Sequence, residues 1–330
     1  MPEPPLSGCV PAFGRHGSYP IRLGWLAKVY SALRDDPLAF SRPQAPVVLG
    51  VGASMVRAMQ FWSRAAGLVR DGERTAAGRP AILTRRGTWL LDDEHGADPY
   101  LDDPATLWLL HWWLLSARPC HLPTARFLFG HWWQSRFTRA ELRTAVQRAA
   151  RVSGWREPSA TLVGRDITAL TAMYATPRPP VPAAAWEELL TSPFRQLSLL
   201  ATDPGATEQD RSPGELLVLH RHQGNTAPRA ILACACLEYA ETVGAQQHGS
   251  ITLGRLHTDP AGPGRLLLAD RAALRAALTW AADQPLAGRI ALTDSAAADD
   301  LLTFTETPLT LAGYLLASRY HRLDGPGEPL

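Results

Sequence analysis

An acidic stretch in the first third of the chain carries the side chains best suited to metal-dependent chemistry. Asp98, Asp102 and Asp103 lie within six residues of one another. Carboxylates hold Mg²⁺ or Mn²⁺, and such an ion offsets the charge that develops when a phosphodiester is attacked. We predict these three residues as a catalytic site, with Asp102 and Asp103 as metal ligands. The alternative is that the carboxylates only cap a helix and carry surface charge.

Basic and amide side chains recur on one side of a helix predicted over residues 54–69. Arg57, Gln60 and Arg64 follow one another at helical spacing, and the apolar residues between them form the opposite stripe. Arginine contacts phosphates and guanine edges, and glutamine contacts adenine edges. This face is therefore predicted to contact DNA, the alternative being a face that is merely solvated.

Further candidates surround this helix in the sequence. Arg85 and Arg86 follow the strand-like segment 81–84, where a β wing touches the DNA backbone. Arg165 lies on a second helical face, and Ser54 is the expected N-cap of the first. The predicted DNA-contacting residues are, in chain order, Arg22, Ser54, Arg57, Gln60, Arg64, Arg85, Arg86 and Arg165.

The elements that must position these residues follow a known order. A helix over 22–33 is followed by a short apolar stretch, a glycine turn, the helix over 54–69, a strand and a short helix. This succession is typical of a winged helix–turn–helix, and the segment 50–69 holds its turn and recognition helix. A second helix–turn–helix-like unit begins near His121, although its sequence shows no obvious wing.

Cap residues place the helices of the remaining chain. Asp103 with Pro104 begins an almost wholly apolar helix that is expected to be buried. Thr138 and Glu141 have the spacing of a capping box, and Ser159 can cap the next helix. We predict a mainly α fold of tandem winged-helix or helix–turn–helix modules with short β wings and a mixed α+β C-terminal part.

Four segments follow from this pattern. The expected division is a winged-helix domain over 1–95, a helical domain over 96–176, a proline-rich linker over 177–186 and a C-terminal α+β domain over 187–330.

The composition limits the class of protein. The net charge is only +2 and Lys28 is the only lysine among 33 basic residues, so any DNA surface must come from local clustering. The four cysteines match neither a disulfide framework nor a zinc ribbon. Neither a signal peptide nor an apolar run of ~18–20 residues is present, which predicts a cytoplasmic chain without a membrane partner.

Several blocks resemble a bacterial family catalogued as domain of unknown function four thousand and seven. The opening GRHGSYPIRLGW contains the family's histidine-glycine, aromatic-proline, arginine and tryptophan positions, although the order Arg-His-Gly departs from the usual Gly-His. The blocks over 49–69 and 98–114 match closely, and the later segments 137–148, 166–174 and 263–278 continue the match.

The resemblance implies a role in DNA sulfur modification. Members of this family are typically encoded beside genes for DNA phosphorothioation, an anti-phage defence in which sulfur replaces a non-bridging phosphate oxygen. One member is understood as the DNA-nicking component of a single-strand version of that system. The resemblance thus implies double-stranded DNA as a partner, together with a cysteine desulfurase, an ATPase and an ATP pyrophosphatase-like sulfurtransferase. A nicking enzyme of this kind implies Mg²⁺ or Mn²⁺.

Two other functions stay open at this point. A non-catalytic adaptor would recognise the DNA site and recruit the sulfur-transfer enzymes, and the lack of a readable nuclease motif favours it. A winged-helix transcriptional regulator would be a dimer on a palindromic site, but the sequence shows no obvious dimerisation helix.

Overall fold

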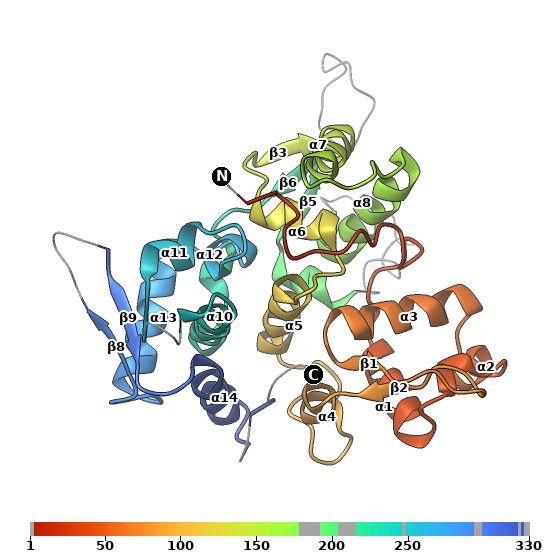
Figure 1. The fold of residues 1–330 in the computed structure, drawn as a ribbon, viewed down its shortest axis with the longest axis horizontal. Helices are drawn as coiled ribbons and strands as arrows, with labels where there is room; N and C mark the ends of the chain where they lie inside the picture. Colours follow the sequence, from red (N-terminus) through yellow and green to blue (C-terminus); the bar gives the residue numbers. More distant parts are fainter. Residues whose placement is uncertain are drawn as a thin grey trace.

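Three groups of elements surround one buried central helix (Figure 1). The computed structural model describes residues 3–177, 192–203, 216–245, 249–293, 299–322 and 325–326. The central helix is α5 (Pro104–Ser116), in which every residue from Ala105 to Leu115 is buried. A helix that is apolar all round has no solvent-facing side, so the other elements pack around it. Its predicted cap is confirmed, because the Asp103 side chain accepts a hydrogen bond from the Ala105 N–H.

The first group is built from helices with one apolar stripe and one β hairpin. In α1 the buried residues Trp25, Leu26, Val29, Tyr30 and Leu33 repeat at helical spacing, as predicted. Two antiparallel strands follow the longest helix of the group. Its elements are α1 (Trp25–Asp35), η1 (Ala39–Ser41), α2 (Ala45–Leu49), α3 (Ala53–Ala65), β1 (Val69–Asp71), β2 (Ala81–Leu83) and α4 (Arg85–Leu91).

The second group joins three α-helices to a four-stranded sheet with strand order β3-β6-β5-β4. The predicted capping box is confirmed at the start of α7, where Thr138 and Glu141 bond reciprocally. The predicted Ser159 cap of α8 is also confirmed. The elements are α6 (Pro123–Gly130), β3 (Arg136–Thr138), α7 (Arg139–Val152), α8 (Ala160–Tyr174), β4 (Ala175–Pro177), η3 (Pro193–Leu197), β5 (Leu200–Asp203) and β6 (Leu216–Leu219).

The third group has a buried helix, α10, packed mainly against α14 and α13. Its thiols Cys234 and Cys236 are buried and free, as expected. The elements are η4 (Gln223–Thr226), α10 (Arg229–Thr242), β7 (Ser250–Thr252), α11 (Leu253–Thr258), α12 (Pro263–Leu266), α13 (Arg271–Asp283), β8 (Ile290–Thr293), β9 (Leu301–Phe304) and α14 (Pro308–Arg319).

The second and third groups share one topology. In each, a strand leads through helices to two antiparallel strands, and the last strand pairs with the first. In this shared part β6 lies between β3 and β5, and β9 lies between β7 and β8. The second helix–turn–helix-like unit showed no obvious wing in its own sequence. The strands that accompany it are β5 and β6, which lie beyond residue 199.

The predicted mainly α class is corrected to mixed α+β, because about half of the described residues are helical and three small sheets accompany the helices there. Residues 178–186 of the expected linker lie outside the described residues. The second sheet draws strands from both sides of that segment, since β3 pairs with β6 and β4 pairs with β5.

Buried polar contacts tie the groups to the central helix. His111 of α5 lies 2.8 Å from the Tyr174 hydroxyl and 2.9 Å from the Leu266 carbonyl oxygen, so it joins α8 and α12. Complete burial lowers the pKa of His111 to about 4, so this side chain is neutral near pH 7. None of the helices among the described residues is long and apolar enough to cross a bilayer.

Candidate nucleic-acid interface

Helix α3 presents the predicted polar face to solvent because its apolar stripe is buried. Val56, Met59 and Trp62 are buried on one side, which turns Arg57 and Gln60 outward. The N-cap of α3 is Gly52 and not Ser54, so the predicted N-cap is wrong. Gly52 already has the extended backbone of a cap, and Ser54 lies in the first turn with its Oγ 3.2 Å from the Tyr19 hydroxyl.

A basic cleft, here named the α3 cleft, lies between α3 and the N-terminal segment. Its volume is about 620 Å³. It brings together the predicted residues Arg57, Gln60 and Arg64, and it adds Arg15 and His121, which sequence reasoning missed. The lining residues are Val10, Pro11, Ala12, Arg15, Arg57, Gln60, Phe61, Arg64 and His121, and none of these is acidic.

Hydrogen bonds donated by its backbone N–H groups fix the N-terminal wall of the cleft at both ends. The Val10 N–H donates to the Cys120 carbonyl oxygen at 3.0 Å, in a parallel bridge between Cys9 and Cys120. The Gly14 N–H donates to Asp166 Oδ1 at 2.7 Å. Cys120 immediately precedes His121, so the same bridge places both the Val10 wall and the His121 side of the cleft.

A buried histidine–aspartate pair holds this segment against α3 and α8. His16 Nε2 lies 3.1 Å from Asp166 Oδ1, and both side chains are almost fully buried. The Ser18 N–H donates to His16 Nδ1 at 3.2 Å, which assigns a proton to Nε2 facing the carboxylate. The imidazole stacks on Trp62, with ring centroids 5.3 Å apart. The family-motif histidine is thus a positioning residue beside the cleft.

Arg57 and Arg64 differ in how far they are engaged. Arg64 forms an ion pair with Asp71 on β1, and its partial burial lowers its pKa from the ordinary value. Arg57 is exposed and forms no ion pair with the part of the chain that the structure describes. Partial burial, with the nearby charge of Arg64, lowers the pKa of His121. The His121 imidazole is therefore neutral near pH 7. Of the two arginines of α3, Arg57 is the one without an ion-pair partner among the described residues.

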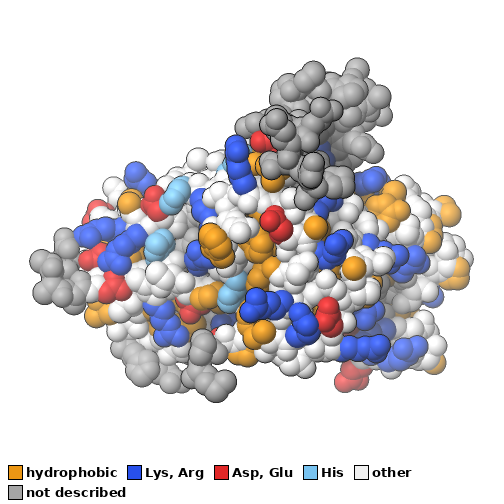
Figure 2. Space-filling view, turned by 90° about the horizontal axis from the view of Figure 1, so that it is seen from above, with side chains coloured by type: hydrophobic (Ala, Val, Ile, Leu, Met, Phe, Trp, Pro, Cys, Tyr) orange, Lys and Arg blue, Asp and Glu red, His pale blue; other side chains and the backbone are white. Residues whose placement is uncertain are grey.

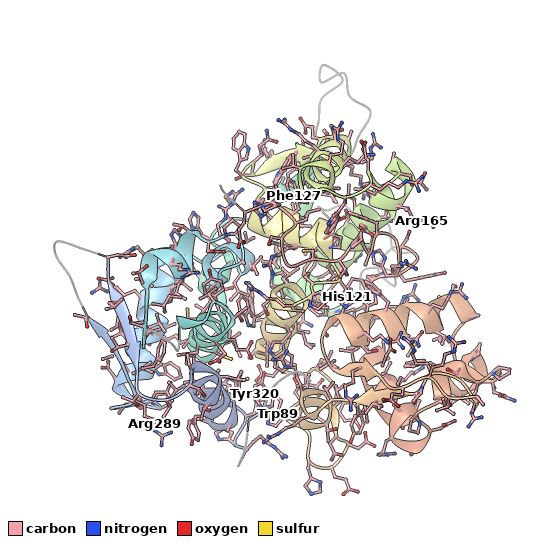
Figure 3. All side chains as sticks on the ribbon, viewed as in Figure 1. Trp89, His121, Phe127, Arg165, Arg289 and Tyr320 are labelled. Atoms are coloured by element: carbon pink, nitrogen blue, oxygen red, sulfur yellow. The ribbon has the colours of Figure 1, made fainter. Side chains whose placement is uncertain are left out.

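Three more of the predicted residues have exposed or half-buried side chains. Arg22 is half-buried, with its guanidinium over the rings of Tyr19 and Trp25 at 5.8 and 5.7 Å. Arg165 is exposed on α8, and a Cβ on Gly14 would lie 3.7 Å from its Cδ. Figure 3 labels Arg165 and His121 on the side of the molecule turned toward α3. Arg85 is exposed as the first residue of α4.

Arg86 does not lie on a surface wing, and its prediction as a DNA contact is corrected. Its side chain is 6% exposed, ion-paired with Glu238 at 3.3 Å and stacked over Trp113 at 4.1 Å. Trp112 and Trp113 donate their indole N–H groups to the same carboxylate at 2.7 and 3.2 Å. This network, here named the Arg86–Glu238 network, joins α4, α5 and α10.

The acidic loop is organised by its own backbone. The two oxygens of Asp98, which is buried, accept the N–H groups of Asp102 and Asp103 at 2.9 and 3.0 Å. Asp103 caps α5 and pairs with Arg319, whereas Asp102 is exposed. No cluster of three histidine, cysteine or acidic residues able to hold a metal occurs among the described residues. The loop as it lies does not fit a divalent cation.

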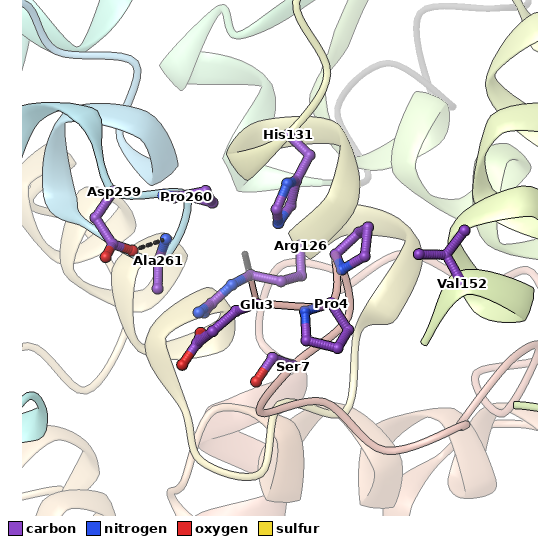
Figure 4. Close-up of a pocket in the computed structure, with 10 residues that line it drawn as sticks. Glu3, Pro4, Ser7, Arg126, His131, Val152, Asp259, Pro260 and Ala261 are labelled. Atoms are coloured by element: carbon purple, nitrogen blue, oxygen red, sulfur yellow. Dashed lines mark hydrogen bonds between the residues drawn. The ribbon is translucent and has the colours of Figure 1, made fainter. Parts of the chain in front are cut away.

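A second pocket lies between the N-terminal residues 3–7, α6 and the loop after α11 (Figure 4). Its volume is about 720 Å³. Arg126 and His131 line it, but the Arg126 guanidinium donates to the Leu115 carbonyl oxygen. The other lining residues are Glu3, Pro4, Pro5, Ser7, Val152, Asp259, Pro260 and Ala261. No predicted site residue lies here.

The face seen from above carries many basic side chains with sparse acidic ones between them (Figure 2). No sequence motif singled out Arg15 or His121, because tertiary contacts bring them to the cleft: the bonds of Gly14 and His16 to Asp166 for Arg15, and the Cys9–Cys120 bridge for His121. The sequence feature nearest to these two residues was the opening segment that resembles the family. Its histidine, His16, holds the N-terminal wall of the cleft in place through Asp166.

Two solved structures share this fold. Both are described as SspB crystal structures, and one of them is magnesium-bound. The magnesium-bound structure has 34% sequence identity and a TM-score of 0.84, and the match covers 97% of this chain and 91% of that one. The other has 34% identity and a TM-score of 0.83, covering 96% and 90%. No curated protein matches this chain.

The family model described as "Protein of unknown function (DUF4007)" matches residues 13–320, which include the acidic loop, the Arg86–Glu238 network and all of the cleft lining except Val10, Pro11 and Ala12. The two SspB structures agree with this assignment over nearly the whole chain. The protein belongs to the DUF4007 family and is similar throughout to SspB.

Proposed function

We propose that this protein is the duplex-DNA-binding component of a bacterial DNA phosphorothioation system of the SspB type, and that it binds through the face that holds the α3 cleft. The observation that carries the proposal is the convergence of Arg15, Arg57 and Arg64 in a cleft without acidic lining. Phosphate contacts by clustered arginines supply most of the affinity of proteins for DNA.

The order of elements supports a winged-helix reading of the first group. In this reading α3 is the recognition helix, and the β1–β2 hairpin is the wing that lies along the backbone. Arg57 and Gln60 then face the groove, and Arg79 before β2 faces phosphate. The second and third groups, which share one topology, are further winged-helix modules, and Arg165 on α8 extends the basic face.

The test is salt-dependent DNA binding by the full chain. We expect Arg15→Ala with Arg57→Ala to weaken duplex affinity and to reduce the slope of log affinity against log salt by about 2, one for each lost phosphate contact. The matched control is Arg289→Ala, since Arg289 lies at the far end of the molecule (Figure 3). An unchanged affinity and slope in the double variant would remove the cleft from the DNA interface.

Nicking is the second candidate function, and the magnesium-bound state of the similar SspB structure favours it. The full chain would be incubated with supercoiled plasmid and Mg²⁺, Mn²⁺ or EDTA, beside Asp102→Ala with Asp103→Ala. Open-circle product that needs metal and is lost in the variant supports the predicted metal ligands. Product that survives the variant moves the site away from this loop.

Binding without nicking supports the adaptor role instead. An adaptor would bring the modification enzymes to the DNA, namely a cysteine desulfurase, an ATPase and an ATP pyrophosphatase-like sulfurtransferase. Co-purification of the full chain with these proteins, in the presence and absence of DNA, separates recruitment from cutting.

A further inference from the structure

Groove binding leaves one property of the α3 cleft unexplained, which is its volume. A recognition helix contacts a duplex with a convex face. Here a concave space of about 620 Å³ opens beside that face. This volume lies within the roughly 300–1,000 Å³ of pockets that enclose small organic ligands. A whole duplex cannot enter such a space, whereas one nucleotide can.

The lining separates into an apolar part and a cationic part. Phe61 lies on α3, and Val10, Pro11 and Ala12 come from the N-terminal segment. Aromatic rings and aliphatic walls suit the flat face of a nucleobase. The arginines of the cleft suit the phosphates on either side of that base. The lining therefore matches the two chemical parts of a nucleotide.

The walls are held in place before any ligand arrives. Phe61 packs edge-on against Trp62 and His16, with ring centroids 5.4 and 5.6 Å apart. The opposite wall is fixed at Val10 and Gly14 by the bonds to Cys120 and Asp166. A preorganised site loses little conformational entropy when a ligand binds.

We propose that the α3 cleft receives a single unpaired nucleotide of a DNA strand, with its base against Phe61 and its flanking phosphates on Arg15 and Arg57. This inference rests on the proposed DNA-binding function and names the form of DNA that the site takes. The cost of unpairing is smallest where the base is already outside the stack, so a bulged nucleotide is the favoured ligand.

The experiment compares three DNAs of one sequence with the full chain: a matched duplex, the same duplex with one bulged thymidine, and that duplex with an abasic bulge. We expect the bulged thymidine to bind roughly 5- to 150-fold more tightly than the abasic bulge, the range for stacking one base on an aromatic ring. The abasic bulge separates recognition of the base from recognition of the bent backbone.

The variants Phe61→Ala and Phe61→Leu should bring the ratio of thymidine to abasic affinity close to 1. Leucine keeps the apolar volume but lacks the ring face, and thermal unfolding of each variant verifies its fold. Arg289→Ala should keep the full ratio. Equal affinity of wild type for all three DNAs overturns the inference but leaves duplex binding standing. Failure to bind any of the three overturns the proposed function itself.

Discussion

The α3 cleft and the Arg86–Glu238 network both centre on arginines, yet they place the same side chain in opposite surroundings. Arg57 is exposed and has no acidic partner among the residues that the structure describes. Arg86 is buried, stacked on Trp113 and paired with Glu238. A guanidinium in solvent can take a phosphate, whereas one with a buried carboxylate already has its anion.

The difference shows that neighbours, not residue type, decide what an arginine does. Arg85 and Arg86 are adjacent in sequence, and both begin α4, but only Arg85 is exposed. The deciding residue for Arg86 is Glu238, which lies 152 positions later. Variants of the two regions should therefore separate loss of stability from loss of DNA affinity.

The largest expected effect is the loss of Glu238. Glu238→Ala leaves Arg86 charged and buried without its partner and also removes the acceptor of two indole N–H groups. We expect the free energy of unfolding to fall by about 3–5 kcal/mol, measured by urea denaturation. The matched control is Glu157→Ala, an exposed acid 3.3 Å from Arg151, which should cost less than about 1 kcal/mol. Similar losses in both variants would contradict the structural role of the network.

A smaller effect, on both the free energy of unfolding and the DNA affinity, is expected at Asp166. This carboxylate faces His16 and accepts from the Gly14 N–H and from the Thr124 hydroxyl at 2.6 Å. Asp166→Asn should lower the free energy of unfolding by about 2–3 kcal/mol, and it should weaken duplex binding because the cleft wall is released. Fluorescence anisotropy with labelled duplex, at a temperature where the variant is folded, measures the second effect. Full DNA affinity in the folded variant would show that the pair does not position the cleft.

The smallest effect concerns pH and His121. Burial and Arg64 hold the pKa of His121 below its ordinary value, while Asp71 opposes them, so the ring gains its proton only in acid. Protonation adds a positive charge to a cleft that already holds Arg15 and Arg57. Duplex affinity should therefore rise modestly as the pH falls below the ordinary pKa of histidine, and His121→Gln should remove that part of the rise. The same rise in both proteins would assign the effect to other groups.

Much of the fold follows from local signals. The stripes of α1 and α3, the Thr138–Glu141 box and the caps at Asp103 and Ser159 are set by residues within one turn, so sequence reasoning finds them. The sheet β3-β6-β5-β4 was not found, because its strands are short and lie far apart in the chain.

The candidate site could be predicted only in part, because some of its residues also lie far apart in the chain. Arg57, Gln60 and Arg64 share one helix and could be predicted together. Arg15 and His121 join them only through tertiary contacts, and the fate of Arg86 depends on Glu238. The prediction of Asp98, Asp102 and Asp103 as a metal site depended on proximity in sequence alone. The structure shows that backbone N–H groups and Arg319 engage two of these carboxylates.

The bond between Gly14 and Asp166, 152 positions apart, also bears on how the protein is made. Helix α3 ends at Ala65, so a chain leaving the ribosome holds this helix roughly 100 residues before Asp166 emerges, about 5–20 s at usual rates of synthesis. During that interval the nascent chain contains the residues of α3, but the N-terminal wall of the cleft lacks its bond to Asp166. The hydrogen bond that fixes the N-terminal wall of the cleft therefore forms only after about half of the chain has been made, when α8 is available.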